Sequence, residues 1–153
     1  MDEFISRLAP HDVIALDTSI LIYHFEAHPR YLPLTRVVLE RINRGLCSAV
    51  ISVLVLMELT VQPLRLEQLA VAQEYEALLA NFPHLQLCDV DRAVTRRAAR
   101  LRARHNVRPV DALHVAGALE QGATAFITND LMLARVQAEI DIVTLEAFAP
   151  ASV

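Results

Sequence analysis

The sequence predicts an α/β protein, with a three-layer α/β/α arrangement around a central parallel sheet of four to five strands. Short runs rich in β-branched residues alternate along the chain with longer segments whose apolar residues recur at helical spacing. This alternation is typical of a parallel sheet covered by helices on both faces. The chain has 153 residues and contains no internal repeat, low-complexity tract or linker, so we expect one domain over residues 1–153.

The first part of the chain is expected to form two strands and three helices. Residues 1–11 read as a loosely attached lead-in that ends at Pro10. The expected elements are a strand over 13–16, a short helix over 19–25 capped by Thr18 or Ser19, a loop containing Pro29 and Pro33, a helix over 34–44 capped by Gly45, and a strand over 46–51. Ser52 then caps a helix over 53–61, which Pro63 is expected to close.

The rest of the chain repeats this alternation. The expected elements are a helix over 66–81, a strand over 85–88, an Arg-rich helix over 91–105, a helix over 109–121 that begins at Pro109 and ends before Gly122, a strand over 125–128, a helix over 130–137 and a strand over 142–144. Strands and helices therefore continue to alternate up to residue 144.

Composition excludes several classes of protein. The longest nearly uninterrupted apolar run, Ala49 to Met57, is far shorter than the ~20 residues that a membrane span needs. The first residues lack the basic-then-apolar pattern of a signal peptide, so we expect a cytoplasmic protein. Cys47 and Cys88 lie far apart in apolar segments, which predicts buried thiols and neither a disulfide nor a zinc site.

The charge distribution limits how the chain can meet nucleic acid. The net charge is −4, so phosphate binding has to come from a local patch or from a bound cation. All fourteen basic residues are Arg. The absence of Lys excludes a Walker-type phosphate loop and any Schiff-base mechanism.

Four acids interrupt apolar segments in similar contexts. Asp17 ends the first strand, Glu58 lies in the helix after the second strand, Asp111 lies in the first turn of a helix, and Asp130 follows a later strand. Strand ends and the turns after them share one edge of a parallel sheet, so these acids are expected to converge. Each also has a structural alternative, since the three Asp residues suit helix N-termini and Glu58 could face solvent.

Converging carboxylates need a compensating charge, because like charges raise one another's pKa. All-oxygen ligation favours Mg²⁺, with Mn²⁺ as the alternative, whereas zinc would call for His or Cys. A divalent cation held by a few carboxylates keeps positions free for water and phosphate oxygens, which suits hydrolysis of a phosphodiester.

At these residues the sequence resembles the PIN-domain nucleases of the VapC-like toxin group. The resemblance covers about residues 13–145 and is carried by four segments in order: LDTSILIY, ISVLVLMEL, RPVDALHVAGAL and FITND. It implies a PIN-like fold, metal-dependent endoribonuclease activity, a homodimer and inhibition by a small antitoxin protein. The family's acidic residues correspond to Asp17, Glu58, Asp111 and Asp130. By this resemblance Asp17, Asp111 and Asp130 would bind Mg²⁺, and Glu58 would hold and deprotonate the attacking water.

Neighbouring polar residues are expected to support these acids. Ser19 stands where family members often have Asn, and Thr128 matches the family's hydroxyl before the last acid. Asn129 is expected beside them. His114 lies one helical turn after Asp111, where it would either support the acids or simply pack in the core.

The Arg-rich segment 92–108 has two interpretations. Val94, Ala98 and Leu101 form its buried stripe by helical spacing, so most of its Arg side chains face outward. They form either a solvated surface or a track for the RNA backbone. The candidate RNA contacts are Arg96, Arg100, Arg104 and Arg108.

Other functions fit less well. A haloacid-type phosphatase needs a second Asp two residues after the first, where this chain has Ser19, and it typically uses a Lys. A receiver domain also needs a Lys. A non-catalytic PIN-like binding module, or a PIN nuclease of RNA processing without an antitoxin, remains as an alternative.

Overall fold

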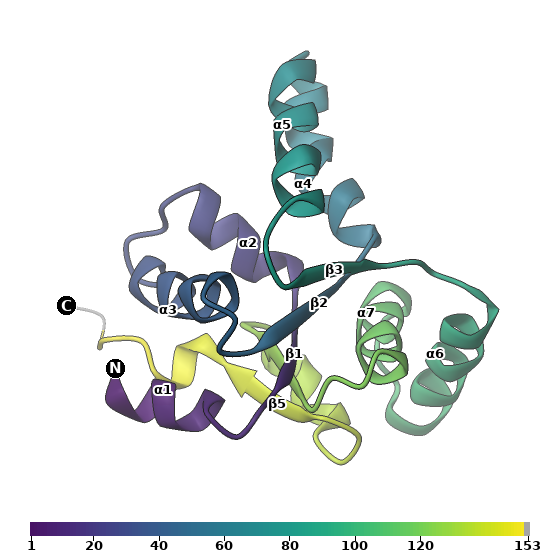
Figure 1. Cartoon of the computed structure of the whole chain (residues 1–153). Coiled ribbons are helices and arrows are strands. Elements are labelled where there is room, and N and C mark those ends of the chain that lie inside the picture. The colour runs from purple at the N-terminus through teal and green to yellow at the C-terminus, as the bar shows by residue number, and fades with distance from the viewer. Residues whose placement is uncertain (152–153) are drawn as a thin grey trace.

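The computed structural model describes residues 1–151, and it contains a sheet of five parallel strands in the order β3-β2-β1-β4-β5 (Figure 1). The strands are β1 Val13–Leu16, β2 Ser48–Ser52, β3 Leu85–Cys88, β4 Ala125–Thr128 and β5 Asp141–Thr144. The α-helices are α1 Asp2–Leu8, α2 Thr18–Phe25, α3 Leu32–Asn43, α4 Leu54–Arg65, α5 Leu69–Ala80, α6 Arg92–His105 and α7 Pro109–Glu120, and the 3₁₀ helices are η1 Leu131–Val136 and η2 Leu145–Ala147. The predicted fold class is confirmed; residues 152–153 of the expected domain lie outside the described part.

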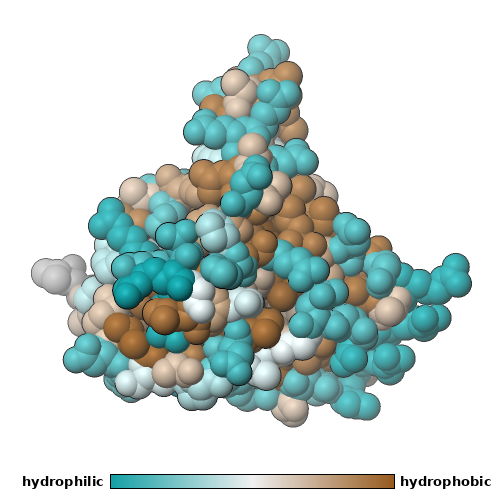
Figure 2. All heavy atoms as spheres, in the orientation of Figure 1, coloured by the Kyte–Doolittle hydropathy of each residue, from teal (hydrophilic) through white to brown (hydrophobic). Residues whose placement is uncertain are grey.

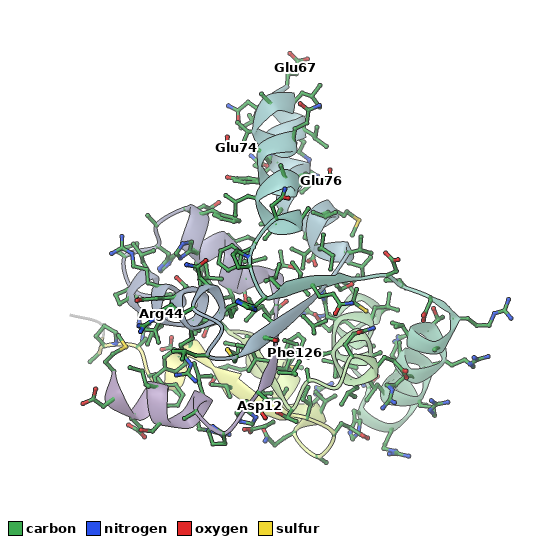
Figure 3. All side chains as sticks on the ribbon, viewed as in Figure 1. Asp12, Arg44, Glu67, Glu74, Glu76 and Phe126 are labelled. Atoms are coloured by element: carbon green, nitrogen blue, oxygen red, sulfur yellow. The ribbon has the colours of Figure 1, made fainter. Side chains whose placement is uncertain are left out.

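Helices cover both faces of the sheet because successive strand residues point to opposite sides. In β1, Ile14 and Leu16 join the core formed with α1, α2 and α3, whereas Ala15 joins the core formed with α6 and α7. Phe126 of β4, labelled in Figure 3, also packs in the second core and is 1% exposed. Strands that are buried on both faces explain the continuous apolar runs of the sequence.

The strand order reverses between β1 and β4. Parallel pairing joins Leu16 of β1 to Ile127 of β4, and Ala15 of β1 to Val50 of β2. The chain moves outward from β1 through β2 to β3, and then returns to the other side of β1 for β4 and β5. This is the topological switch point, where the carboxyl ends of β1 and β4 leave a crevice suited to ligands.

The expectation of a loosely attached lead-in is wrong. Residues 2–8 form α1, and Phe4 and Leu8 are buried in the first core. Arg7 pairs with Asp141 at the start of β5. A helix this short gives a weak periodic signal, and its stability comes from these tertiary contacts.

The expected end of the helix over 53–61, which is α4 in the structure, is also wrong. Helix α4 continues to Arg65 with Pro63 inside its last turn. The missing amide of Pro63 removes one helical hydrogen bond, and the ring itself is buried. Smaller shifts affect other elements: α3 begins at Leu32 and includes Pro33, β2 begins at Ser48, α5 begins at Leu69, and the segment after Asp130 is a 3₁₀ helix.

Helices α4 and α5 form a hairpin that projects from the rest of the molecule (Figure 1). Glu67 lies at its tip with φ of 56°, and Glu74 and Glu76 lie along it (Figure 3). Figure 2 shows apolar residues among the polar ones on the hairpin. Its exposed apolar side chains are Met57, Val61, Leu64, Leu66, Leu69 and Leu78. None of the helices in the described residues meets the length and hydropathy needed to cross a membrane.

Candidate metal centre

The candidate site lies at the carboxyl ends of β1 and β4, at the switch point. Asp17 directly follows β1, and its amide donates to the carbonyl of Ile127 in β4 at 2.9 Å. Thr128 ends β4, and Asp130 caps η1 two residues later. The topology therefore brings the first and last of the four acids to one edge of the sheet.

Asp17 is held by hydrogen bonds to both carboxylate oxygens. Its Oδ1 accepts from the amide of Thr18 at 2.8 Å, and its Oδ2 accepts from the hydroxyls of Thr128 at 2.7 Å and Ser19 at 3.3 Å. Asp17, and not Thr18 or Ser19, is the N-cap of α2. Burial raises the pKa of Asp17, and the nearby charge of Asp111 adds to this shift.

Glu58 does not simply face solvent. Its Oε1 lies 2.7 Å from Nε2 of His114 and accepts from the hydroxyl of Thr18 at 2.8 Å. The hydrogen bond from His114 lowers the pKa of Glu58, so this carboxylate is ionised at neutral pH. The His114 side chain is 2% exposed, and its Nδ1 has no hydrogen-bond partner among residues 1–151. His114 is therefore both packed in the core and in contact with the acids.

Arg108 connects the other two acids. Its Nε donates to Oδ2 of Asp111 at 2.7 Å, and its second guanidinium nitrogen donates to Oδ2 of Asp130. Asp130 also accepts from the amide of Met132 through Oδ1 at 2.9 Å, and its own amide donates to Thr128 Oγ1 at 3.0 Å. Arg108 was expected only as an RNA contact.

The structure thus links all four predicted acids through short polar bridges. Thr18 connects Glu58 with Asp17, Thr128 connects Asp17 with Asp130, and Arg108 connects Asp130 with Asp111. Thr18 was expected only as a possible helix cap, and its link to Glu58 was not predicted. The signal for it was a hydroxyl directly after the first acid.

The remaining predicted residues differ in whether they contact the four acids. Asn129 accepts from the amide of Glu146 through its side-chain oxygen at 2.9 Å, which connects the segment after β4 to η2. Arg104 pairs with Glu139 at 3.0 Å on the outer side of α6. Arg96 and Arg100 are exposed on α6, and neither forms an ion pair within the described residues. Of the four candidate RNA contacts, Arg108 alone touches the acids.

The donor set fits a hard divalent cation in its chemistry. Asp17, Asp111 and Asp130 offer carboxylate oxygens and no sulfur, which suits Mg²⁺ or Mn²⁺ better than zinc. Burial is the main cause of the raised pKa of Asp17, and the charge of Asp111 adds to it, so a nearby positive charge would favour the ionised form of Asp17. Within residues 1–151, however, no three His, Cys, Asp or Glu side chains are grouped closely enough to enclose an ion. Arg108 lies between two of the acids instead.

Solved structures share this fold. A toxin-antitoxin complex from Klebsiella pneumoniae contains a chain with a TM-score of 0.64 and 19% identity, covering 86% of this chain and 97% of its own. VapBC2 from Rickettsia felis, bound to a DNA fragment from its promoter, gives a TM-score of 0.64 at 19% identity. This match covers 86% of this chain and 98% of that chain. DNA-bound VapBC from Salmonella typhimurium gives a TM-score of 0.58 at 23% identity, and the match covers 86% of this chain and 97% of that chain.

The sequence itself was compared with curated proteins and with protein families. No curated protein matched. The PIN domain family matches residues 14–139, which is most of the chain and contains all four linked acids. The strand order, the acids at the switch point and this match agree, and the chain belongs to the PIN domain family.

Proposed function

We propose that this chain is a Mg²⁺-dependent endoribonuclease that hydrolyses RNA phosphodiester bonds at the four-carboxylate site, and that it is the toxin of a toxin–antitoxin pair. One observation carries the catalytic part. Acids from four separate segments of a PIN domain are connected through Thr18, Thr128 and Arg108 at one edge of the sheet. Carboxylates brought to one edge of a sheet repel one another, and a divalent cation would offset the repulsion that Arg108 leaves uncompensated.

Asp17, Asp111 and Asp130 would hold the cation. When bound there, a divalent cation would neutralise charge on the scissile phosphate and make a water molecule more acidic. The hydroxyls of Thr128 and Ser19 orient Asp17 toward this task.

Glu58 is suited to accept a proton from the attacking water. Its lowered pKa keeps it ionised, and His114 and Thr18 hold the same oxygen, Oε1, in place. The second oxygen, Oε2, accepts no hydrogen bond within the described residues, so it is available to a water molecule.

A protein partner is supported by two observations. The structural neighbours include toxin-antitoxin complexes. The α4–α5 hairpin also exposes apolar side chains, with Leu64 at 49% and Leu69 at 59%, as expected of a protein-binding surface. If the partner binds there, replacing Leu64 and Leu69 by Asp will abolish co-purification with an antitoxin that the wild-type protein retains. Unchanged co-purification would remove the hairpin from the proposed interface.

Cleavage of total RNA tests the catalytic proposal. The wild-type protein is expected to cut RNA with Mg²⁺ and to stop when EDTA is added. Asp17→Asn and Asp111→Asn should each slow cleavage at least ~100-fold, because each removes charge from the cation site. Glu67→Gln at the hairpin tip is the matched control and should cut at the wild-type rate. Undiminished cleavage by Asp17→Asn would refute the assignment, and RNA binding without any cleavage would favour the non-catalytic alternative.

A further inference from the structure

The guanidinium of Arg108 occupies the position between Asp111 and Asp130. Its contacts to both acids use their Oδ2 atoms, with Nε of Arg108 2.7 Å from Asp111. The Asp111 and Asp130 side chains are 17% and 26% exposed, whereas that of Arg108 is 70% exposed. The guanidinium of Arg108 thus reaches these two largely buried carboxylates from the solvent side.

At Asp130, Arg108 holds the oxygen that an ion would need. Oδ1 of Asp130 already accepts from the amide of Met132, so Oδ2 is the oxygen left for a ligand. A divalent cation on these carboxylates would lie close to the guanidinium that already holds them, and two positive charges at such a short separation repel each other. Binding of the ion and the present position of Arg108 therefore oppose each other.

Arg108 can leave without being buried elsewhere. A surface pocket of about 170 Å³ lies beside Asp111, and Arg108 lines it together with Met132 and Arg135. The hydrogen bond and charge of Asp111 raise the pKa of Arg108, so the guanidinium keeps its charge at any working pH. Because the side chain is largely exposed, it remains hydrated once its two carboxylate partners are taken.

We infer that Arg108 is an internal counter-ion, which a divalent cation has to displace from Asp111 and Asp130, and which therefore weakens the affinity of the site for that cation. The inference rests on the proposed function in one respect: it takes the acids as the binding site of a divalent cation. It assigns to Arg108 a role separate from contact with RNA.

Calorimetric titration with Mn²⁺, in the absence of RNA, tests this inference. Arg108→Ala is expected to bind Mn²⁺ about tenfold more tightly than the wild-type protein, since a competing cation is removed. Arg104→Ala is the matched control: it removes the same charge four residues earlier in the chain, near the end of α6, where Arg104 pairs with Glu139. At physiological salt its effect should stay below about twofold, because Arg104 is exposed and paired with Glu139 and contacts neither Asp111 nor Asp130. Arg108→Gln repeats the test if the alanine variant folds poorly.

The outcomes separate this inference from the proposed function. Tighter binding by Arg108→Ala and Arg108→Gln, but not by Arg104→Ala, supports the competition. Equal or weaker Mn²⁺ binding by both Arg108 variants, with measurable binding by the wild type, overturns the role of Arg108 and leaves the metal site intact. Absence of Mn²⁺ binding in all four proteins overturns both, because no cation site would exist.

Discussion

At the scale of single residues, the ionised carboxylate of Asp17 lowers the stability of the folded protein. Asp17 is partly buried and carries a raised pKa, which means that its charged form is less favourable in the folded protein than in the unfolded chain. Between the two pKa values the folded state binds more protons, so the stability contributed by this group falls as the pH rises through that window. Where Asp17 is ionised, its charge therefore opposes folding.

Replacing Asp17 by Asn is expected to stabilise the protein while it abolishes cleavage. The amide keeps the shape of the carboxylate and can still accept from the amide of Thr18, but it carries no charge. We expect a gain of about 1 kcal/mol, or about 2–4 °C in Tm for a chain of this length. Thermal unfolding at pH 7 without metal is the measurement. A fall in Tm would mean that the hydrogen bonds to the carboxylate stabilise the protein more than the burial of its charge destabilises it.

Residue-level reasoning predicted the four acids but not their links. An acid inside an apolar segment is visible in the sequence, as with Glu58 among Leu56, Met57 and Leu59. The bridge from Thr18 to Glu58 joins residues forty positions apart, and its geometry depends on how α2 packs near α4. The link from Arg108 to Asp130 likewise depends on tertiary structure, because only its spacing to Asp111 is local.

At the scale of elements, an ion pair adds to the apolar contacts that hold α1 against the sheet. Asp141 begins β5, and its Oδ1 accepts from Arg7 of α1 and, at 3.0 Å, from Gln137. Its Oδ2 lies 3.1 Å from Nε2 of His11. Burial alone would raise the pKa of Asp141, but the hydrogen bonds from Arg7 and Gln137 outweigh it and hold the pKa below its ordinary value of 3.8.

Asp141→Asn is expected to destabilise the protein by about 1–2 kcal/mol at pH 7. The lowered pKa means that this contribution is fully present above pH 3.8 and is lost as the pH falls through the folded-state value. The difference in free energy of unfolding between the wild type and the variant should therefore be smaller at pH 3 than at pH 7, as measured by urea unfolding at both pH values. Glu3→Gln, an exposed acid on α1, is the control and should change little. A difference in free energy of unfolding that stays constant between pH 3 and pH 7 would contradict the ionic role of Asp141.

Helix α6 offers a second test at this scale. Arg96 and Arg100 are exposed on its surface, and the C-terminal end of α6 leads directly to Arg108. If these side chains follow the RNA backbone, each contact releases counterions from RNA.

The double variant Arg96→Ala/Arg100→Ala should then reduce the slope of log K against log salt by about 1.4, at about 0.7 per contact with single-stranded RNA. RNA binding is measured in the Asp17→Asn background across a salt series, so that the RNA stays intact. Arg36→Ala/Arg44→Ala removes equal charge from α3, which packs on the other face of the sheet. Equal slopes in the two double variants would favour the solvated-surface interpretation of α6.

The elements themselves were largely predictable where their signals were strong. The strands over 85–88 and 125–128 have the predicted bounds, because each apolar run ends at a clear polar boundary. The prediction failed at α1, which has only seven residues, and at Pro63, where burial and a position near the helix end make the proline tolerable. In both cases tertiary contacts outweighed the local signal.

At the scale of the whole molecule, topology explains why distant acids meet. The reversal of strand order between β1 and β4 opens the crevice, and the loops after these strands supply Asp17 and Asp130. With a net charge of −4, the molecule as a whole repels RNA, so the proposed binding of RNA requires a bound cation or the arginines near the crevice to provide the attraction. The expected homodimer stays a prediction that sedimentation equilibrium can check.

The central claim is that these acids form one site for a divalent cation. A crystal structure of the protein grown with Mn²⁺, with an anomalous difference map, tests it most directly. We expect a peak bound by oxygens of Asp17, Asp111 and Asp130, with the guanidinium of Arg108 moved away from both of its present partners. A map with well-ordered acids, no peak between them and Arg108 still bridging Asp111 and Asp130 would contradict the claim.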